Sequence, residues 1–307
     1  MDQRLLLMHQ VMLADAPRLR AYDAALEAAV QPDDVVIDVG AGTLVLSMMA
    51  LRHGARHVYA IEADPTMAAV AERIAADNDL KGKLTLVQGD ARAANLPEKA
   101  DVIVSEMMGN LGPEEEMATV VSSVARRNLR HGGRIVPRRL VTELAAIEFD
   151  NEGWGLWRDA TPDDPIGGVL SYRLDALQEF AEPGAQLHFF QREPTFLSSP
   201  EPISDDIITT ERPRKRAPST TKLTINRPGT LQAIMGYFTA ELTDGVSLSN
   251  YPSYPGCNWA VWVWPLRHGA VREGDEVVVD VLPPSRRTQA REPTDWRLDC
   301  RVVRARR

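Results

Sequence analysis

Acidic residues gather directly after one short apolar stretch of the chain. Residues 101–105 predict a β-strand, and Glu106 follows it at once. A turn containing Gly109 and Gly112 then leads to three consecutive glutamates, residues 114–116. Such a turn can bring Glu106 and one later glutamate face to face, and paired carboxylates suit a guanidinium ion because its planar N–H donors bind them bidentately. Alternatively, the three glutamates are only the acidic first turn of a helix, which the helix dipole favours.

A glycine turn lies further upstream and has the spacing of a nucleotide site. Residues 35–39 predict a strand, Gly40 and Gly42 follow it, and residues 44–51 have a helical pattern. A second apolar run ends on Glu62, 22 residues beyond Gly40. Nucleoside-binding α/β units place there the carboxylate that accepts hydrogen bonds from ribose hydroxyls.

The identity of the nucleoside depends on the form of this turn. NAD, FAD and S-adenosylmethionine sites all use glycine turns, but dinucleotide sites require a third glycine where this chain has Val45. The run Asp-Val-Gly-Ala-Gly-Thr, residues 38–43, therefore favours S-adenosylmethionine. The alternative is a β-α-β unit whose glycines only make a tight turn.

Composition excludes several classes of protein. The chain has 307 residues, 44% of them hydrophobic, which is enough for a full core and two domains. Its net charge of −8 has the wrong sign for general nucleic-acid binding. No segment approaches the ~20 apolar residues of a membrane span, and residues 1–10 lack a signal-peptide pattern, so we expect a soluble cytoplasmic protein without a membrane partner. Cys257 and Cys300 have no metal-binding spacing, so no metal site is expected.

The order of elements predicts two architectures in one chain. Residues 3–30 have a helical pattern with a break near Pro17. From residue 35 to about 137 strands alternate with helices, which argues for a parallel sheet with its ligand at the carboxyl ends of the strands. The expected strands are 35–39, 57–61, 84–88, 101–105 and 134–136, and the expected helices are 44–53, 65–79 and 114–129.

After residue 137 short strands follow one another without helices, which is typical of a β-sandwich or a barrel-like domain. The expected strands are 141–149, 186–191, 203–210, 220–225, 233–242, 259–264, 276–281 and 296–303. Residues 151–182 fit neither pattern and are a candidate arm that packs on a partner chain. Residues 212–216 are a basic run, interpreted as a solvated loop rather than a binding patch.

Together these segments resemble the protein arginine N-methyltransferases, from His9 to about Val281. In that family the loop after the fourth strand reads Ser-Glu-x-x-Gly, with a second glutamate nine positions after the first, which corresponds to Glu106 and Glu115. The segment from His9 to Tyr22 is similar to the family's His-Glu-x-Met-Leu-x-Asp-x-x-Arg-x-x-x-Tyr. The resemblance implies a helical lid over residues 1–34, a Rossmann-like class I methyltransferase domain over 35–137, and an all-β barrel-like domain over 138–307 with a dimerisation arm, hence a homodimer.

The resemblance also assigns roles to single residues. Glu106 and Glu115 would be catalytic, and Met12, Met117, Asn258 and Trp259 would contact the substrate. The cofactor would be S-adenosylmethionine, leaving as S-adenosylhomocysteine, with Arg18 on its carboxylate and Glu62 on its ribose. The other residues assigned to the cofactor are His9, Asp38, Gly40, Gly42, Asp90 and Ala91, and the last two lie with Gly89 at the adenine edge.

Two positions depart from the family pattern. Leu44 stands where the family has a glycine at the start of the helix, and its side chain either crowds the cofactor or points towards the sheet; we expect at least weaker binding. Asn258 replaces the histidine of a Thr-His-Trp loop, and an amide cannot relay a proton as histidine does.

Three functions follow as hypotheses. The first is methyl transfer to arginine in a protein or peptide, with the two glutamates concentrating positive charge on the nitrogens that they bind, and with Glu115 taking the proton. The second keeps this chemistry and uses free arginine or another small guanidino metabolite as substrate. The third, motivated by Leu44, is a non-catalytic binding protein on a methyltransferase scaffold.

Overall fold

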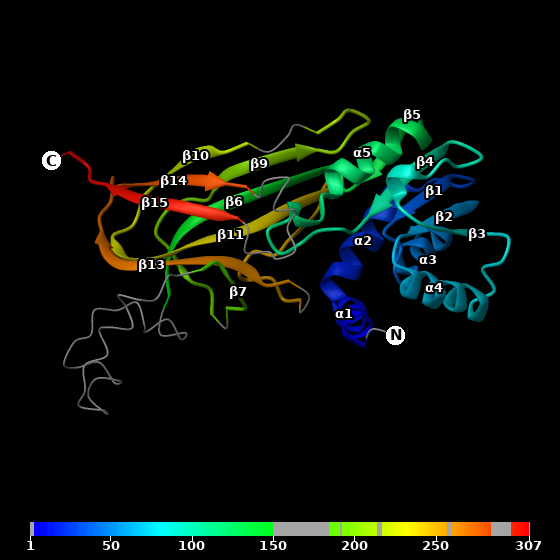
Figure 1. Ribbon diagram of the computed structural model, residues 1–307, viewed down its shortest axis with the longest axis horizontal. Helices are drawn as coiled ribbons and strands as arrows, with labels where there is room; N and C mark the ends of the chain where they lie inside the picture. Colours follow the sequence, from blue (N-terminus) through cyan, green and yellow to red (C-terminus); the bar gives the residue numbers. More distant parts are fainter. Residues whose placement is uncertain are drawn as a thin grey trace.

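The computed structural model describes residues 3–149, 184–190, 192–213, 217–256, 259–283 and 296–306. Figure 1 shows a parallel sheet with its helices at one end of the molecule and antiparallel sheets at the other. The proposed arm over 151–182, residues 214–216 of the basic run, and Asn258 lie outside the described residues. No helix in the described part of the chain is both long enough and apolar enough to cross a bilayer.

The parallel sheet has five strands in the order β3-β2-β1-β4-β5. Their bounds are β1 (Val35–Val39), β2 (His57–Glu62), β3 (Leu84–Gln88), β4 (Ala100–Ser105) and β5 (Leu129–Val136). Strands β1 and β4 are buried along their whole length, as expected for apolar runs covered on both faces. The strand order reverses between β1 and β4, so the carboxyl ends of these two strands form the usual ligand-binding position of such a sheet.

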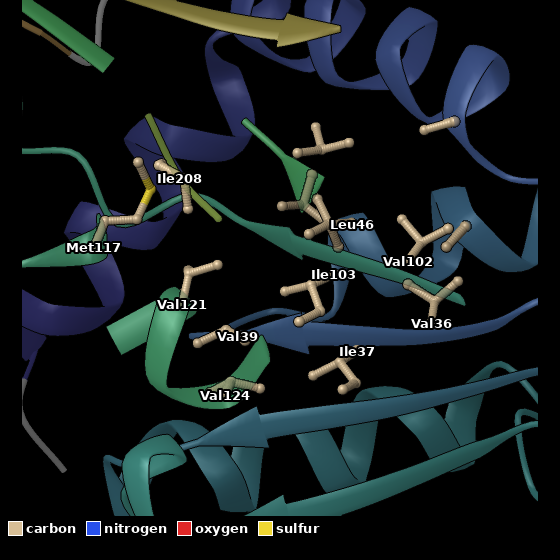
Figure 2. Packing of buried hydrophobic residues seen from close by; sticks show 14 of the residues in the cluster. Val36, Ile37, Val39, Leu46, Val102, Ile103, Met117, Val121, Val124 and Ile208 are labelled. Atoms are coloured by element: carbon tan, nitrogen blue, oxygen red, sulfur yellow. The ribbon is translucent and has the colours of Figure 1, made fainter. Parts of the chain in front are cut away.

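Five α-helices accompany this sheet. They are α1 (Gln3–Ala14), α2 (Ala16–Ala29), α3 (Val45–Arg52), α4 (Pro65–Asp77) and α5 (Met117–Asn128), with short 3-10 turns η1 (Ala91–Ala93) and η2 (Pro113–Glu115). The predicted break in the first helix is confirmed, and it falls at Asp15, whose side chain caps α2 by accepting from the Arg18 N–H. Figure 2 shows part of the core, where Val39 and Ile103 of the sheet lie beside Val121 and Val124 of α5.

The helix expected over 114–129 begins later than predicted. The first glutamates of the run instead belong to η2, and Glu116 has a left-handed backbone with φ 55°, so α5 begins only at Met117. Glu114 and Glu115 therefore lie in the short η2 turn rather than in the first turn of α5. The left-handed backbone at Glu116 separates η2 from α5, which matters for the site below.

The second half of the chain is antiparallel, and each of the eight strands expected there has a counterpart. The strands are β6 (Arg139–Glu148), β7 (Gln186–His188), β8 (Thr195–Phe196), β9 (Glu201–Ile207), β10 (Ser219–Thr224), β11 (Gly229–Thr243), β12 (Val246–Ser249), β13 (Val261–Val271), β14 (Glu276–Leu282) and β15 (Arg297–Val303). One sheet has the order β7-β13-β11-β6-β8, with β12 on β11 and β9 on β6; the other is β10-β14-β15.

Helix α2 joins the two halves. It contacts α3 and β5 of the parallel half and β11 and β12 of the antiparallel half. Tyr22 and Leu26 on this helix share a core with Phe238 and Trp259 from the antiparallel half. The N-terminal helices therefore lie between the two halves, next to the ends of β1 and β4 (Figure 1).

Candidate functional site

The two segments singled out by the sequence leave the sheet side by side. Val39 and Ser105, the last residues of β1 and β4, are paired across the sheet, and the Ser105 hydroxyl donates to the Val39 carbonyl at 2.8 Å. The glycine turn after Val39 and the acidic loop after Ser105 therefore start from neighbouring points. A ligand bound by the turn would lie next to a ligand bound by the loop.

Both glycine positions of the turn exclude a side chain, because of their backbone conformation and because neighbouring side chains lie too close. Gly40 and Gly42 have φ values of 76° and 47°, which side chains rarely adopt. A Cβ on Gly40 would lie 3.0 Å from Cγ of Met107, and a Cβ on Gly42 would lie 2.8 Å from Cε1 of His9. The imidazole of His9, on α1, thus packs against the turn, and burial lowers the pKa of that ring.

Glu62 holds the turn from the neighbouring strand. Its two carboxylate oxygens accept from the backbone N–H groups of Gly42 and Asp64, each at 2.8 Å. Each oxygen keeps a further lone pair for another donor. The carboxylate is buried against the turn, where its predicted contact with ribose hydroxyls requires it to be.

Two buried polar atoms near the turn have no partner among the described residues: Oδ1 of Asp38 and Nε of Arg18. The other oxygen of Asp38 accepts from the Ser47 hydroxyl at 2.7 Å, and burial raises the pKa of this carboxyl to about 7. An acceptor and a donor left open in one region fit a ligand that carries both an ammonium and a carboxylate group. The amino-acid end of S-adenosylmethionine is such a ligand.

Glu106 lies deep in the site and already binds a guanidinium group. Nη1 of Arg18 is 2.5 Å from Oε2 of Glu106, and both side chains are almost fully buried. Burial raises the pKa of Glu106, while the charge of Arg18 opposes the rise. The Arg18 guanidinium also lies over the Trp259 ring, 6.0 Å from its centroid, and Trp259 Nε1 donates to the Met108 carbonyl at 3.1 Å.

Glu115 differs from Glu106 because it is reachable from solvent. Desolvation, followed by the charges of Glu106 and Glu114, raises the pKa of its carboxyl to about 7. Glu115 therefore lies within electrostatic reach of Glu106, and the face-to-face arrangement of the two carboxylates stays a prediction. A carboxyl that is accessible and titrates near neutral pH can exchange a proton with a bound substrate.

Glu114 has a structural role that the sequence analysis missed. Its Oε1 accepts from the Leu111 N–H at 2.6 Å and from Trp262 Nε1 on β13 at 3.0 Å. Its carboxyl also lies against Gly109, where an added Cβ would come within 2.5 Å of it. Glu114 thus ties the acidic loop to the antiparallel sheet. The only sequence signal was the unbroken run of three glutamates, which does not reveal the different direction of each.

The remaining predicted residues have varied surroundings. Met12 is half-buried on α1, Met117 is completely buried in the main core beside Val121 (Figure 2), and Trp259 is buried. Asp90 caps η1 by accepting from the Arg92 N–H at 2.9 Å, and Ala91 is buried. Contact of these residues with a substrate or an adenine ring stays a prediction.

Among the described residues there is no group of three histidine, cysteine, aspartate or glutamate side chains placed to hold a metal ion.

The side chain of Leu44 points into the core. It has a left-handed backbone with φ 62° as the N-cap of α3, and its side chain is fully buried beside Ala41, Ala60 and Ala71. Of the two orientations considered from the sequence, this is the one towards the sheet. The backbone adopts a conformation suited to glycine, while the leucine side chain fills the space between α4 and the sheet. The expected weakening of cofactor binding thus has no steric cause in the orientation of Leu44.

Replacing Leu44 by glycine is expected to destabilise the protein without tightening cofactor binding. Loss of a buried leucine side chain costs about 2–5 kcal/mol, and relief of the left-handed backbone returns about 1–2 kcal/mol. We expect a net loss of about 1–3 kcal/mol in the free energy of unfolding, measured by urea titration. Leu44→Ala, which keeps the strain and loses the packing, should be less stable than Leu44→Gly. A markedly lower Kd for S-adenosylmethionine in Leu44→Gly would contradict this reading.

Comparisons with known proteins find similarity to methyltransferases. A family profile described as ribosomal protein L11 methyltransferase (PrmA) matches residues 23–128. Protein arginine N-methyltransferase 1 of Chlamydomonas reinhardtii is 27% identical over 279 residues, covering 88% of this chain and 78% of the relative. Protein arginine N-methyltransferase 1 of Schizosaccharomyces pombe is 38% identical over 157 residues, covering 49% of this chain and 46% of the relative.

Solved structures show the same fold. The Trypanosoma brucei PRMT1 enzyme-prozyme heterotetrameric complex with AdoHcy has a chain that superimposes with a TM-score of 0.77 at 24% identity, covering 97% of this chain and 93% of that one. Arabidopsis thaliana protein arginine methyltransferase 10 superimposes with a TM-score of 0.75 at 21% identity, covering 96% and 97% of the two chains. Both combine the parallel and the antiparallel halves in one chain.

Proposed function

We propose that the chain is a protein arginine N-methyltransferase, as its similarity to that family supports, and that it transfers a methyl group from S-adenosylmethionine to a guanidino nitrogen of arginine in a protein or peptide. The observation that carries this proposal is the position of Glu106. Its carboxylate follows β4, binds a guanidinium at 2.5 Å, and lies next to the glycine turn that follows β1. The guanidinium-binding site and the nucleoside-binding site would thus lie next to each other, at the ends of adjacent strands.

The proposed cofactor contacts use the atoms that the fold leaves open. Oδ1 of Asp38 would accept from the ammonium group, and Nε of Arg18 would donate to the carboxylate. Glu62 would bind the ribose hydroxyls while it holds Gly42, and His9 would cover the turn from α1. When bound, S-adenosylmethionine supplies an electrophilic methyl group on a sulfonium sulfur.

The proposed role of the two glutamates is to bind and orient the substrate guanidinium. Glu106 is buried, so its charge acts in a region of low dielectric constant and attracts a cation strongly. Together with Glu115 it would draw positive charge onto the nitrogens that it binds, leaving electron density on the nitrogen that is methylated. The positive charge of Arg18 favours the ionised form of Glu106 and so opposes the effect of burial, which raises the pKa of this carboxyl.

Glu115 is the proposed proton acceptor. A methylated guanidinium has one proton to lose, and Glu115, whose carboxyl has a pKa of about 7 and is accessible, would take it. Its accessibility allows that proton to pass on to solvent.

We also propose the finer features implied by the family resemblance: a barrel-like antiparallel domain, a homodimer formed through residues 151–182, and a cytoplasmic location. The net charge of −8 favours encounter with basic, arginine-containing segments.

The direct test offers three methyl acceptors with S-adenosylmethionine: an arginine-containing peptide, the same peptide with lysine in place of arginine, and free arginine. We expect mass spectrometry to detect an added methyl group on the arginine peptide alone. Turnover of free arginine with none of the peptide would favour the small-molecule hypothesis. Binding of S-adenosylmethionine without transfer to either form of arginine would favour a non-catalytic binding protein.

A further inference from the structure

Hydrogen bonds and ring contacts link Glu106 to a closed circuit of side chains from three segments of the chain. Arg18, on α2, contacts Glu106 and Trp259, and the Trp259 indole donates to the loop that carries Glu106. The ring of Tyr254 lies 5.8 Å from that of Trp259. The Tyr254 hydroxyl then donates to Oδ1 of Asp15 at 2.6 Å, three residues before Arg18. The circuit thus returns to the N-terminal helices where it began.

The Asp15 carboxylate is the point at which this circuit meets the joint between α1 and α2. It is buried, with 1% of its surface exposed, and the same Oδ1 also caps α2 by accepting from the Arg18 N–H at 3.2 Å. The Tyr254 phenol therefore binds the very oxygen that fixes where α2 begins. Gly256 passes close over the pair, since an added Cβ there would lie 2.5 Å from Oδ1 of Asp15.

Helix α1 needs such a tether because its own packing is weak. None of the side chains of Gln3–Ala14 is buried, and Leu7, Met8, Val11 and Leu13 are exposed. Helix α2, in contrast, buries Tyr22, Ala25 and Leu26 in the core. Yet α1 carries His9, which packs against Gly42 of the turn. A helix with so little buried surface is positioned largely by how it is joined to α2.

We propose that Tyr254 is a positioning residue: by holding Asp15, it sets the joint between α1 and α2 so that α1 covers the glycine turn and favours cofactor binding. This inference rests on the proposed function in that the turn binds S-adenosylmethionine. Tyr254 does not contact the reacting groups in this role. It acts through Asp15 on His9, and through Trp259 on Arg18.

The test compares Tyr254→Phe with Tyr251→Phe. Both changes remove one phenol hydroxyl from the same connection between β12 and β13. Tyr251 hydrogen-bonds to the carboxylate of Glu193 and stacks on Phe196, away from the N-terminal helices. It is therefore a control for loss of a phenol–carboxylate hydrogen bond in general.

For Tyr254→Phe we expect about fivefold to tenfold weaker binding of S-adenosylmethionine by calorimetry, because a hydrogen bond to a charged group contributes on the order of a factor of ten. At saturating cofactor kcat should change less than about twofold, so the effect appears in KM for the cofactor. Amide hydrogen exchange should accelerate in residues 3–14 and stay unchanged in the strands of the parallel sheet. Tyr251→Phe should alter none of these quantities.

A conservative change at the other partner separates the tether from the cap. Asp15→Asn retains a carbonyl oxygen that can accept both hydrogen bonds. Amide hydrogen exchange over residues 3–14 should therefore be slower in Asp15→Asn than in Tyr254→Phe. Unchanged cofactor affinity and unchanged exchange of α1 in Tyr254→Phe would overturn the proposal, as would equal effects in Tyr251→Phe. If the unaltered chain fails to bind S-adenosylmethionine, the proposed function fails, and hydrogen exchange of α1 alone then decides whether Tyr254 is a tether.

Discussion

Replacement of Glu106 by glutamine is expected to lower kcat/KM for an arginine peptide by about a hundredfold to a thousandfold. Glutamine keeps the shape of the side chain but removes the negative charge, and charge-assisted hydrogen bonds to a cation in a buried site are among the strongest available to a protein. Loss of the charge also removes the bias that concentrates positive charge away from the nitrogen to be methylated. Steady-state rates with a fixed peptide and saturating S-adenosylmethionine measure the effect.

The matched control for this change is Glu98→Gln. Glu98 also accepts from an arginine, Arg56, at 2.8 Å, but both side chains are exposed and remote from the turn and the acidic loop. We expect its rate to equal that of the unaltered chain. Cofactor affinity in Glu106→Gln, measured by calorimetry, should stay within several-fold of normal because Arg18 remains in place. A variant at Glu106 that binds cofactor and methylates at full rate would remove Glu106 from the mechanism.

Activity is expected to rise with pH through a midpoint near 7, governed by Glu115. The pKa of its carboxyl is raised to about 7, so the group is protonated below that pH. A protonated carboxyl neither binds a guanidinium strongly nor accepts its proton, and kcat should fall about tenfold per pH unit on the acid side. Glu115→Gln should lower kcat by about a hundredfold and abolish this acid limb. A pH–rate profile from pH 5.5 to 9 measures both.

Glu116→Gln is the control for the pH profile, because Glu116 is the adjacent glutamate and is exposed. Its profile should match that of the unaltered chain, and an acid limb that moves in this variant instead of in Glu115→Gln would reassign the proton acceptor.

The stability of the fold should change with pH in the opposite direction to activity. Asp38 and Glu115 both have raised pKa values of about 7, so the folded state binds protons more tightly than the unfolded state between the ordinary carboxyl pKa and 7. The free energy of unfolding should therefore fall as the pH rises from the ordinary carboxyl pKa to about 7, and level off above it.

Local patterns in the sequence were enough to predict most of the fold. The five parallel strands, the glycine turn and the later series of short strands each show as a run of apolar residues ended by glycine, proline or acidic residues. Such runs indicate whether a segment is buried, and the spacing of their apolar residues indicates a helix or a strand. This works because the direction of each side chain follows from the local backbone conformation. The sequence could also predict that Gly40 and Glu106 lie close together, since the carboxyl ends of parallel strands meet at one edge of the sheet.

Hydrogen bonds between residues that lie far apart in the sequence could not be predicted from local patterns. Arg18 binds Glu106, 88 residues away, Glu114 binds Trp262, 148 residues away, and Asp15 binds Tyr254, 239 residues away. Nothing in a local pattern distinguishes these pairs from many others of equal chemistry, because the packing of distant segments against one another brings them together. The same holds for Leu44, whose left-handed backbone turns a side chain that could have crowded the cofactor into the core. Residue types and spacing thus indicated which chemistry the chain carries, whereas packing of distant segments decided which charges are paired, which carboxyls titrate near neutral pH and what holds the N-terminal helices over the site.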